Sequence, residues 1–401
     1  MRSIGVVTGA RSDYGVYRPI LRKIQADPEL KLLLFVCGAH LLPQYGMTVK
    51  EIEADGFPIA ERVEMLLTSD TPAAVAESMG RGTAGFARAF VRTRPDILLV
   101  VGDRFEMHAA VVAALPFNIP VAHIAGGELT EGAIDDSLRH SITKLSHLHF
   151  TQTREYAERV MRMGEEPWRV SVCGSPSLDN LRALQMLPAA ELEQRLGVRL
   201  DKPFLLVTYH PVTLEMDDTG RQIAELLAAL EAIGMPVVFT MPNADPANAT
   251  IRRAVQQYAA ARENAWALEN LGTQMYFSMM ALAAAMAGNS SSGMVEAPSF
   301  RLPVVNIGTR QDGRVRAANM IDVGYGREEI AAAIRRAVSP EFRAALRDSR
   351  SPYGEGDASA CIVERLKSVP LDAKLIRKRF VDAPPAGAAA QPPARRSGPA
   401  S

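Results

Sequence analysis

The chain has 401 residues, enough for two domains of ordinary size that each bury a core. Lysine plus arginine equals aspartate plus glutamate, 45 of each, so the formal net charge is zero. Nothing global therefore attracts nucleic acid or an anionic membrane, and any preference for anions must be local. No apolar run approaches the roughly 18 residues of a membrane span. We expect a soluble cytoplasmic protein with neither nucleic acid nor membrane as a partner.

The cysteines and the N-terminus support the same expectation. Cys37, Cys173 and Cys361 are odd in number, well separated, and each lies in or beside apolar sequence. This pattern is typical of buried reduced thiols rather than of a disulfide framework. The first residues run directly into a predicted strand and lack the long apolar core of a signal peptide.

Short apolar runs alternate with amphipathic stretches in the first half of the chain. The runs predict buried strands at Ile4–Val7, Leu32–Val36, Ile97–Val101, Pro120–Ile124, Leu148–Thr151 and Val170–Cys173. Between them, the spacing predicts helices over Tyr17–Gln25, Pro72–Thr93, Glu106–Leu115, Ser137–Leu145 and Glu155–Met163. This alternation indicates an α/β fold with a parallel, doubly wound sheet.

The same rhythm pauses around 184–201, with a short helix at Ala189–Leu196, and then starts again. Further strands are predicted at Phe204–Thr208, Val237–Met241, Ala265–Leu268, Ala283–Ala287 and Val304–Ile307. We therefore expect one domain over 1–183 and a second over 184–370, whose last helix could cross back to the first. Residues 371–401, rich in Pro, Ala, Gly and Ser toward the end, are expected to form a disordered tail.

The first strand is followed by a small-residue turn that contains Arg11 and Asp13. Backbone N–H groups in such a turn can face an anion, although the sequence matches neither a Rossmann glycine fingerprint nor a P-loop. The alternative is an ordinary tight turn, with Arg11 solvated and Asp13 capping the helix. Position alone does not separate these two interpretations.

Acids and bases follow the strands that end near residues 101 and 124. Asp103 comes after the first of them, and Glu128 and Asp135 after the second, with Arg139 and His140 next along the chain. Carboxyl ends of parallel strands are where open α/β sheets bind ligands. Neighbouring carboxylates push their pKa values apart and can supply one acid and one base. We expect a site for a small anionic molecule here.

The second half of the chain carries a complementary set of residues. Ser290, Ser291 and Ser292 follow a predicted strand and precede a helix, so their hydroxyls and nearby amides favour a diphosphate. Glu296 could then accept hydrogen bonds from a ribose, whereas a plain serine cap with Glu296 assisting is the alternative. His210 ends a strand before a proline and is predicted to contact substrate or handle a proton.

His123, His140, His147 and His149 invite a zinc hypothesis, since imidazoles and nearby carboxylates ligate that ion. Their spacing fits no common zinc pattern. Structural or hydrogen-bonding roles are therefore favoured, and no metal or other cofactor is expected.

Taken together, the motifs resemble those of the hydrolysing UDP-N-acetylglucosamine 2-epimerases of bacterial sialic acid synthesis. The matching segments are 10–14 (ARSDY), 102–106 (GDRFE), 126–128 (GGE) after His123, 135–140 (DDSLRH), 174–176 (GSP), 210–213 (HPVT), 242–243 (PN), 288–293 (GNSSSG) and 306–311 (NIGTRQ). They run in order through about residue 370, so the resemblance covers all but the tail.

The resemblance implies two Rossmann-like domains facing a cleft, the glycosyltransferase-B architecture, with UDP held mainly by the second domain. It implies a homodimer or homotetramer and a UDP-sugar substrate. Carried over by motif, Asp103, Glu128, Asp135 and His210 form the catalytic set. The substrate-binding set is Arg11, Asp13, Arg139, His140, Asn243, Ser290, Ser291, Ser292, Glu296 and Arg310.

The family's reaction is anti elimination of UDP to a glycal, followed by syn addition of water, which gives N-acetylmannosamine and UDP. Non-hydrolysing members typically carry Gly-Thr-Arg-Pro-Glu in the first turn and Glu-Ala-Gly-Leu-Arg after the fifth strand. This chain has ARSD at 10–13 and AGGE at 125–128 instead, which favours hydrolysis. The alternatives are an epimerase of UDP-N,N′-diacetylbacillosamine, a non-hydrolysing epimerase, a glycosyltransferase, and a catalytically silent nucleotide-sugar sensor.

Overall fold

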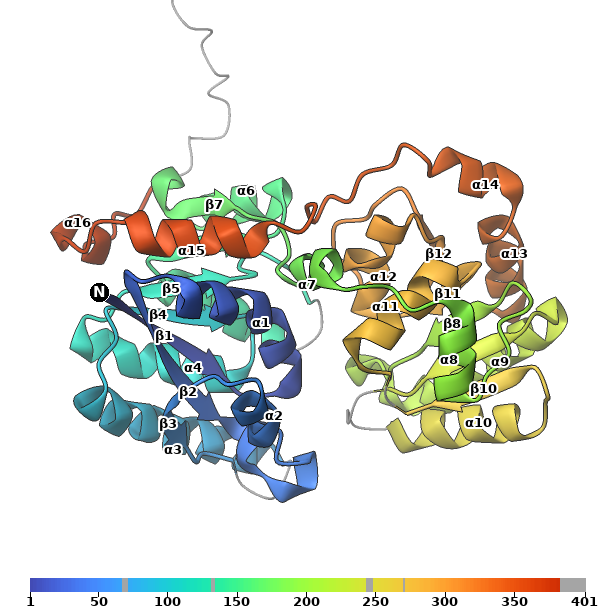
Figure 1. The fold of residues 1–401 in the computed structure, drawn as a ribbon, viewed down its shortest axis with the longest axis horizontal. Coiled ribbons are helices and arrows are strands. Elements are labelled where there is room, and N and C mark those ends of the chain that lie inside the picture. The colour runs from blue at the N-terminus through green and yellow to red at the C-terminus, as the bar shows by residue number, and fades with distance from the viewer. Residues whose placement is uncertain (67–70, 131–133, 243–247, 270, 383–401) are drawn as a thin grey trace, which may run out of the picture.

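The computed structural model describes residues 1–66, 71–130, 134–242, 248–269 and 271–382. Two α/β domains lie side by side, each built on one parallel sheet (Figure 1). The first sheet has seven strands: β1 (Arg2–Thr8), β2 (Leu30–Cys37), β3 (Ile59–Val63), β4 (Ile97–Val101), β5 (Val121–Ile124), β6 (Leu148–Thr151) and β7 (Val170–Val172). The second has six: β8 (Leu205–Thr208), β9 (Val237–Thr240), β10 (Ala265–Leu268), β11 (Ala285–Gly288), β12 (Val304–Ile307) and β13 (Met320–Val323).

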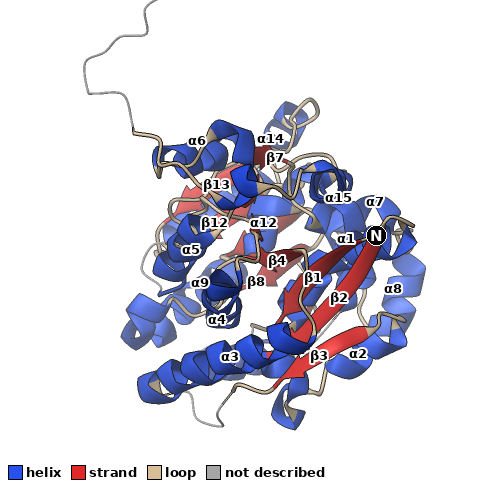
Figure 2. Ribbon diagram, turned by 90° about the vertical axis from the view of Figure 1, so that its left-hand side faces the viewer, coloured by secondary structure: helices blue, strands red, loops and turns tan. Residues whose placement is uncertain are grey.

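Helices cover both faces of the strands, as the turned view shows (Figure 2). In the first domain they are α1 (Arg11–Ala26), α2 (Val49–Ala54), α3 (Pro72–Arg92), α4 (Phe105–Ala114), α5 (Ile134–Leu145) and α6 (Arg154–Arg162). The linker and second domain contribute α7 (Ser177–Ala183), α8 (Ala189–Leu196), α9 (Thr219–Ile233), α10 (Asn248–Ala260), α11 (Gly272–Leu282), α12 (Ser291–Val295), α13 (Arg327–Ala337) and α14 (Pro340–Ala345). Among the described helices, none is both long and apolar enough to cross a bilayer.

Both sheets have the strand order of a Rossmann fold. The first runs β3-β2-β1-β4-β5-β6-β7 and the second β10-β9-β8-β11-β12-β13. The direction of winding reverses between β1 and β4, and again between β8 and β11. Ligands of open α/β sheets bind outside the carboxyl ends of strands at such reversals. The predicted fold class, two Rossmann-like domains in the glycosyltransferase-B architecture, is confirmed.

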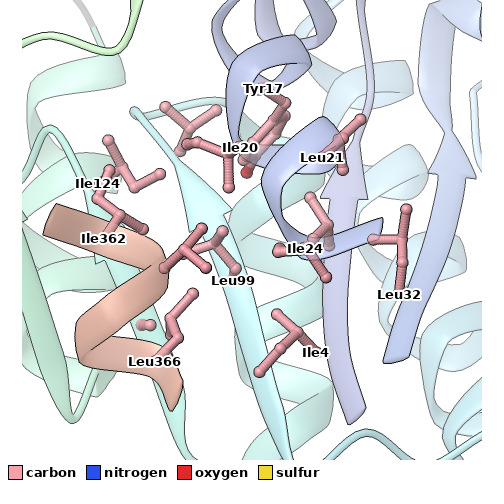
Figure 3. Packing of buried hydrophobic residues seen from close by; sticks show 14 of the residues in the cluster. Ile4, Tyr17, Ile20, Leu21, Ile24, Leu32, Leu99, Ile124, Ile362 and Leu366 are labelled. Carbon is pink, nitrogen blue, oxygen red and sulfur yellow. The ribbon is translucent and has the colours of Figure 1, made fainter. Parts of the chain in front are cut away.

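The chain returns to the first domain at its end. Helix α15 (Ala358–Ser368) packs beside α1 on the first sheet, with Ile362 and Leu366 in the same buried cluster as Ile4, Ile20 and Leu99 (Figure 3). A short helix α16 (Ala373–Ile376) follows, and Leu375 is buried in that cluster as well. The first domain therefore contains residues from both ends of the described chain.

The expected tail begins too early at residue 371. Arg169 is buried and donates to the carbonyl oxygens of Leu375, Lys374 and Arg377 at 2.8–3.1 Å, which fastens this segment to the first domain. The composition of the segment does not predict this attachment, because Arg169, which holds it, lies about 200 residues earlier in the sequence. Residues 383–401 lie outside the described part of the chain.

Two strands were missed, and both are edge strands. β3 contains Glu61 and Arg62, and β13 contains Asp322, so neither is a continuous apolar run. The charged side chains are partnered at the edges: Glu61 accepts from Arg92 at 2.7 Å, and Asp322 accepts from Asn306 at 2.7 Å. An edge strand is not enclosed on all sides, and it can carry charge that a central strand cannot.

The expectation of reduced thiols is wrong for two cysteines. Cys173, just after β7, and Cys361, in α15, form a disulfide with their Cα atoms 5.6 Å apart, whereas Cys37 is a free buried thiol. The partners are 188 residues apart and meet only because α15 crosses back to the first domain. The cytoplasmic location, which reduced thiols would have favoured, stays a prediction.

Replacing Cys361 with serine tests this bond. Because the cross-link restricts a loop of 188 residues in the unfolded chain, its loss is expected to lower the free energy of unfolding by about 2–4 kcal/mol. Urea unfolding with and without dithiothreitol measures this effect. Reductant should destabilise the wild type and leave the Cys361→Ser variant unchanged; equal sensitivity in both would contradict the assignment.

Candidate active site

The turn after β1 is held by a buried carboxylate. Asp13 accepts hydrogen bonds from the backbone N–H groups of Gly9 (3.1 Å) and Ala10 (3.0 Å), so α1 begins at Arg11, six residues earlier than predicted. Burial raises the pKa of Asp13 to about 6, opposed by the nearby cation of Arg104. These bonds match the capping interpretation of Asp13. Arg11 is exposed and lies 3.7 Å from Glu51.

Beside this turn lies an ion pair that sequence reasoning did not single out. Glu106 is fully buried at the start of α4 and accepts from the Arg104 guanidinium at 2.7 and 3.1 Å. The Glu106 side chain also lies against Gly9 and against Gly38, and at Gly38 an added β-carbon would have too little room. The predicted motif 102–106 therefore contributes a packed support for the first turn, in addition to Asp103.

Asp103 forms an ion pair with Arg139 of α5, across the carboxyl end of β4. Arg139 also donates to the hydroxyl of Thr130 at 2.9 Å, while its Nε and Nη1 are buried and have no hydrogen-bond partner among the described residues. Burial lowers the pKa of Arg139 to about 9, with the cation of Arg314 adding to the effect. The guanidinium thus keeps its charge near neutral pH and has unused donors.

Asp135 and His140 lie on the same helix as Arg139. Asp135 is four residues before Arg139 in the first turn of α5, so the two side chains share a face. His140 lies 3.4 Å from Asp136, and burial lowers its pKa. Of the three carboxylates expected to converge, Asp103 is therefore ion-paired with Arg139 and Asp135 shares a helix face with it, whereas the convergence of both with Glu128 stays a prediction.

Glu128 is placed by its neighbouring glycine. Gly127 has φ +80°, and a β-carbon there would clash with the backbone oxygen of Tyr156. The Glu128 side chain is almost completely buried, its Oε1 has no hydrogen-bond partner among the described residues, and its Oε2 lies 3.9 Å from Arg314. Burial raises the pKa of Glu128, opposed by Arg314. A carboxyl group in this environment favours its protonated form.

The histidines near these acids have structural partners. His123 Nε2 lies 2.7 Å from the carbonyl oxygen of Gly102 and so must donate to it, while Nδ1 lies 3.2 Å from the hydroxyl of Thr143. Burial lowers the pKa of His123 to about 3, which keeps the ring neutral. His147 accepts from the Val121 N–H at 3.1 Å, and His149 lies 3.0 Å from Glu165. Within the described ranges, no three His, Cys, Asp or Glu side chains group closely enough to hold a metal ion.

The second half of the site lies at the reversal between β8 and β11. Asn289 accepts from the His210 N–H at 2.7 Å and donates to the His210 carbonyl at 2.9 Å, which locks the two strand ends together. Gly288 has φ +132°, and a β-carbon there would overlap the carbonyl oxygen of Thr208. Burial lowers the pKa of His210 to about 3, and Arg310 adds to this, so the imidazole is neutral.

The serine loop follows directly. The Ser290 hydroxyl accepts from the Ser292 N–H at 3.3 Å, as a helix cap does, and Ser291 is exposed. Tyr276 of α11 lies against this loop: burial raises its pKa, and its hydroxyl interacts with Ser292, Thr208 and Ser290. Sequence reasoning missed Tyr276, because α11 carries no local motif.

Glu296 is the C-cap residue of the five-residue helix α12. Its carboxylate accepts from the hydroxyl of Ser177, in the linker helix α7, at 2.6 Å, and burial raises its pKa. Arg310 and Gln311 both donate to the carbonyl oxygen of Asn289, at 3.1 and 2.8 Å. Asn243 lies outside the described residues.

Residues 311–316 of the second domain contact the first domain. Arg314 approaches Glu128, and the neighbouring Val315 N–H donates to the Tyr156 hydroxyl at 3.0 Å. Tyr353 donates to the Val315 carbonyl at 2.8 Å. Arg314 therefore brings a cation from the second domain to the acids of the first. No pattern in the sequence points to it, since its partner is 186 residues away.

One Rossmann-like domain has carboxylates and an arginine at its strand ends, and the other has a serine loop and a neutral histidine at its own. This combination defines a nucleotide-sugar enzyme of the glycosyltransferase-B class. Comparison with known proteins names the family: residues 22–367 match the UDP-N-acetylglucosamine 2-epimerase family model, and this chain belongs to that family.

Individual relatives of this chain also have names that describe 2-epimerases. The chain is 38% identical over 95% of its length to 99% of the "GDP/UDP-N,N'-diacetylbacillosamine 2-epimerase (hydrolyzing)" of Campylobacter jejuni. It is 35% identical over 94% of its length to 99% of the UDP-N,N'-diacetylbacillosamine 2-epimerase (hydrolyzing) of Legionella pneumophila. The crystal structure of UDP-GlcNAc 2-epimerase from Neisseria meningitidis bound to UDP-GlcNAc superposes with a TM-score of 0.77 at 21% identity, over 91% of this chain and 99% of that one.

Gly127→Ala tests how Glu128 is positioned. The side chain would strain a left-handed backbone and collide with Tyr156, so we expect a loss of about 1–3 kcal/mol in the free energy of unfolding. Gly80→Ala is the matched control, because that position in α3 has open space and ordinary helical geometry. Chemical denaturation should show a gain of about 0.5–1 kcal/mol for the control. Similar stability of both variants would refute the argument.

Proposed function

We propose that this protein is a hydrolysing 2-epimerase of a UDP-linked 2-acetamido sugar, which releases the free epimerised sugar and UDP. The observation that carries the proposal is that two candidate carboxyl groups lie in opposite environments. Glu128 is buried with a raised pKa and an unpartnered oxygen, whereas Asp103 is ion-paired with Arg139. Pairs of acids whose environments differ in this way supply one acid and one base.

The two environments suggest different catalytic roles for the two carboxyl groups. Asp103, which is ion-paired with Arg139, is the candidate base for the C2 proton, with Asp135 on the same helix face as Arg139. Glu128, which favours its protonated form, is the candidate acid that returns a proton to C2 from the other face. The unused donors of Arg139 are available to the sugar or its acetamido group.

The departing UDP is assigned to the second domain. Breaking the C1–O bond places negative charge on the diphosphate, and hydroxyl and cationic groups aimed at that charge stabilise the transition state. Ser291, Ser292, His210 and Arg310 are the candidate contacts, together with Arg11 from the first domain. Glu296 would meet the ribose, and it is already oriented by its hydrogen bond from Ser177.

In this scheme, base removal of the C2 proton and loss of UDP from C1 form a glycal. The acid then delivers its proton to C2, and water adds its hydroxyl to C1 and gives its remaining proton to the carboxylate left on Glu128, so the overall change is hydrolysis with inversion at C2. The proposal assigns no step to a metal ion or cofactor. Assembly as a homodimer or homotetramer and a cytoplasmic location stay predictions.

Two sugars are candidates. The sequence favours UDP-N-acetylglucosamine, which would give N-acetylmannosamine. The names of the Campylobacter and Legionella relatives favour UDP-N,N′-diacetylbacillosamine as the second candidate. These sugars differ at C4 and C6, so a direct comparison of kcat/KM for the two decides between them.

The reaction type is tested by incubating the protein with each UDP-sugar in heavy water, without added metal. We expect UDP together with a free 2-epimerised sugar that carries deuterium at C2, identified by NMR and mass spectrometry. Recovery of a UDP-linked epimer alone would assign the chain to the non-hydrolysing type. Binding of UDP with no turnover of either sugar would support a silent sensor instead.

Glu128→Gln tests the acid assignment. The amide keeps the shape of the side chain but cannot deliver the proton, so kcat should fall by about 10²–10⁴-fold while calorimetric affinity for UDP is retained. The matched control is Glu158→Gln, an exposed carboxylate on α6. Turnover within a few-fold of the wild type in Glu128→Gln would remove this residue from the catalytic set.

A further inference from the structure

A cavity of about 580 Å³ lies at the junction of the two domains. Three segments line it: the linker helix α7, the 3₁₀ helix η6 (Ala297–Phe300) with the residue after it, and residues 347–355, where the chain returns toward the first domain. In Figure 1 the linker and the returning segment are the two connections between the domains. None of the predicted site residues lines this cavity, so it is separate from the serine loop and from the acids of the first domain.

The lining is rich in arginine. Arg182 comes from α7, Arg301 follows η6, and Arg347 and Arg350 come from the returning segment, against only two acids, Asp348 and Glu355. Among the described residues, none of these four guanidinium groups has an ion-pair partner. In a chain whose formal net charge is zero, this is a local excess of positive charge.

Four arginines from three segments suit a phosphorylated ligand. Each guanidinium presents a planar set of donors that matches phosphate oxygens in pairs, and charge-assisted bonds of this kind are the strongest hydrogen bonds in proteins. The volume is that of a site for a small molecule of nucleotide size. Leu178, Leu181 and Pro298 add an apolar wall for the uncharged part of such a molecule.

We propose that this cavity is a second anion site, which binds a diphosphate-bearing ligand of the nucleotide class and joins both domains through it. The inference goes beyond the proposed function and does not depend on it, since the cavity shares no residue with the candidate active site.

Inorganic pyrophosphate is the probe, titrated by calorimetry into the full chain at low ionic strength, where charge interactions are least screened. Arg347→Ala/Arg350→Ala should bind one pyrophosphate fewer per chain than the wild type, or bind it at least about tenfold more weakly at that site. Turnover of the UDP-sugar should stay at the wild-type level in this variant. The matched control is Arg88→Ala, an exposed arginine on α3, which should bind as the wild type does.

A wild type that binds no pyrophosphate would overturn the proposal. So would equal binding by the wild type and the Arg347→Ala/Arg350→Ala variant, or an equal loss in Arg88→Ala. Thermal melts check that each variant folds; if the first pair does not, Arg182→Ala/Arg301→Ala removes the charge from the opposite walls and carries the same expectation. Because binding is measured without turnover, failure here is distinguishable from failure of the proposed function.

Discussion

The geometry of the candidate site depends on the two segments that connect the domains, the linker and the returning segment. These two segments are hydrogen-bonded to each other. The Ser175 N–H in the linker donates to the Tyr353 carbonyl in the returning segment at 2.7 Å. The carboxylate of Asp179 in α7 accepts from the N–H groups of Ala358 (3.0 Å) and Ser359 (2.7 Å), which caps α15. Because both segments are held together, the second domain has a defined position from which Arg314 reaches Glu128 and Glu296 reaches Ser177.

Buried polar groups fall into two kinds in this protein. Those that build the scaffold are paired: Asn289 with the His210 backbone, His123 with Gly102, and Asp13 with two backbone amides. Among the described residues, Glu128 and Arg139 instead keep buried atoms without a partner, as do several groups away from the candidate site, such as Tyr17 and Trp168. Unsatisfied buried groups cost free energy, so the unpartnered atoms of Glu128 and Arg139 are open to hydrogen bonds from a ligand or from water.

Much of the fold and part of the site could be predicted from the sequence. The central strands were found because a strand enclosed by helices must be apolar throughout, whereas β3 and β13 were missed because edge strands can carry charge. Asp103 and Glu128 were singled out because loops after parallel strands meet at one edge, and their roles stay predictions. The contacts made by Arg314, Tyr276 and Ser177 could not be predicted, because their partners lie in other elements and leave no local pattern in the sequence.

The sequence by itself determined the α/β class, the two-domain rhythm and the residue types at the strand ends, because hydrophobic periodicity and turn chemistry are local properties. Only the tertiary structure decided that Glu128 is buried with a raised pKa while Asp103 is ion-paired, that Cys173 and Cys361 meet, and that four arginines line one cavity between the domains. Each of these results depends on which distant segments pack together. Desolvation and charge pairing act through space and not along the chain.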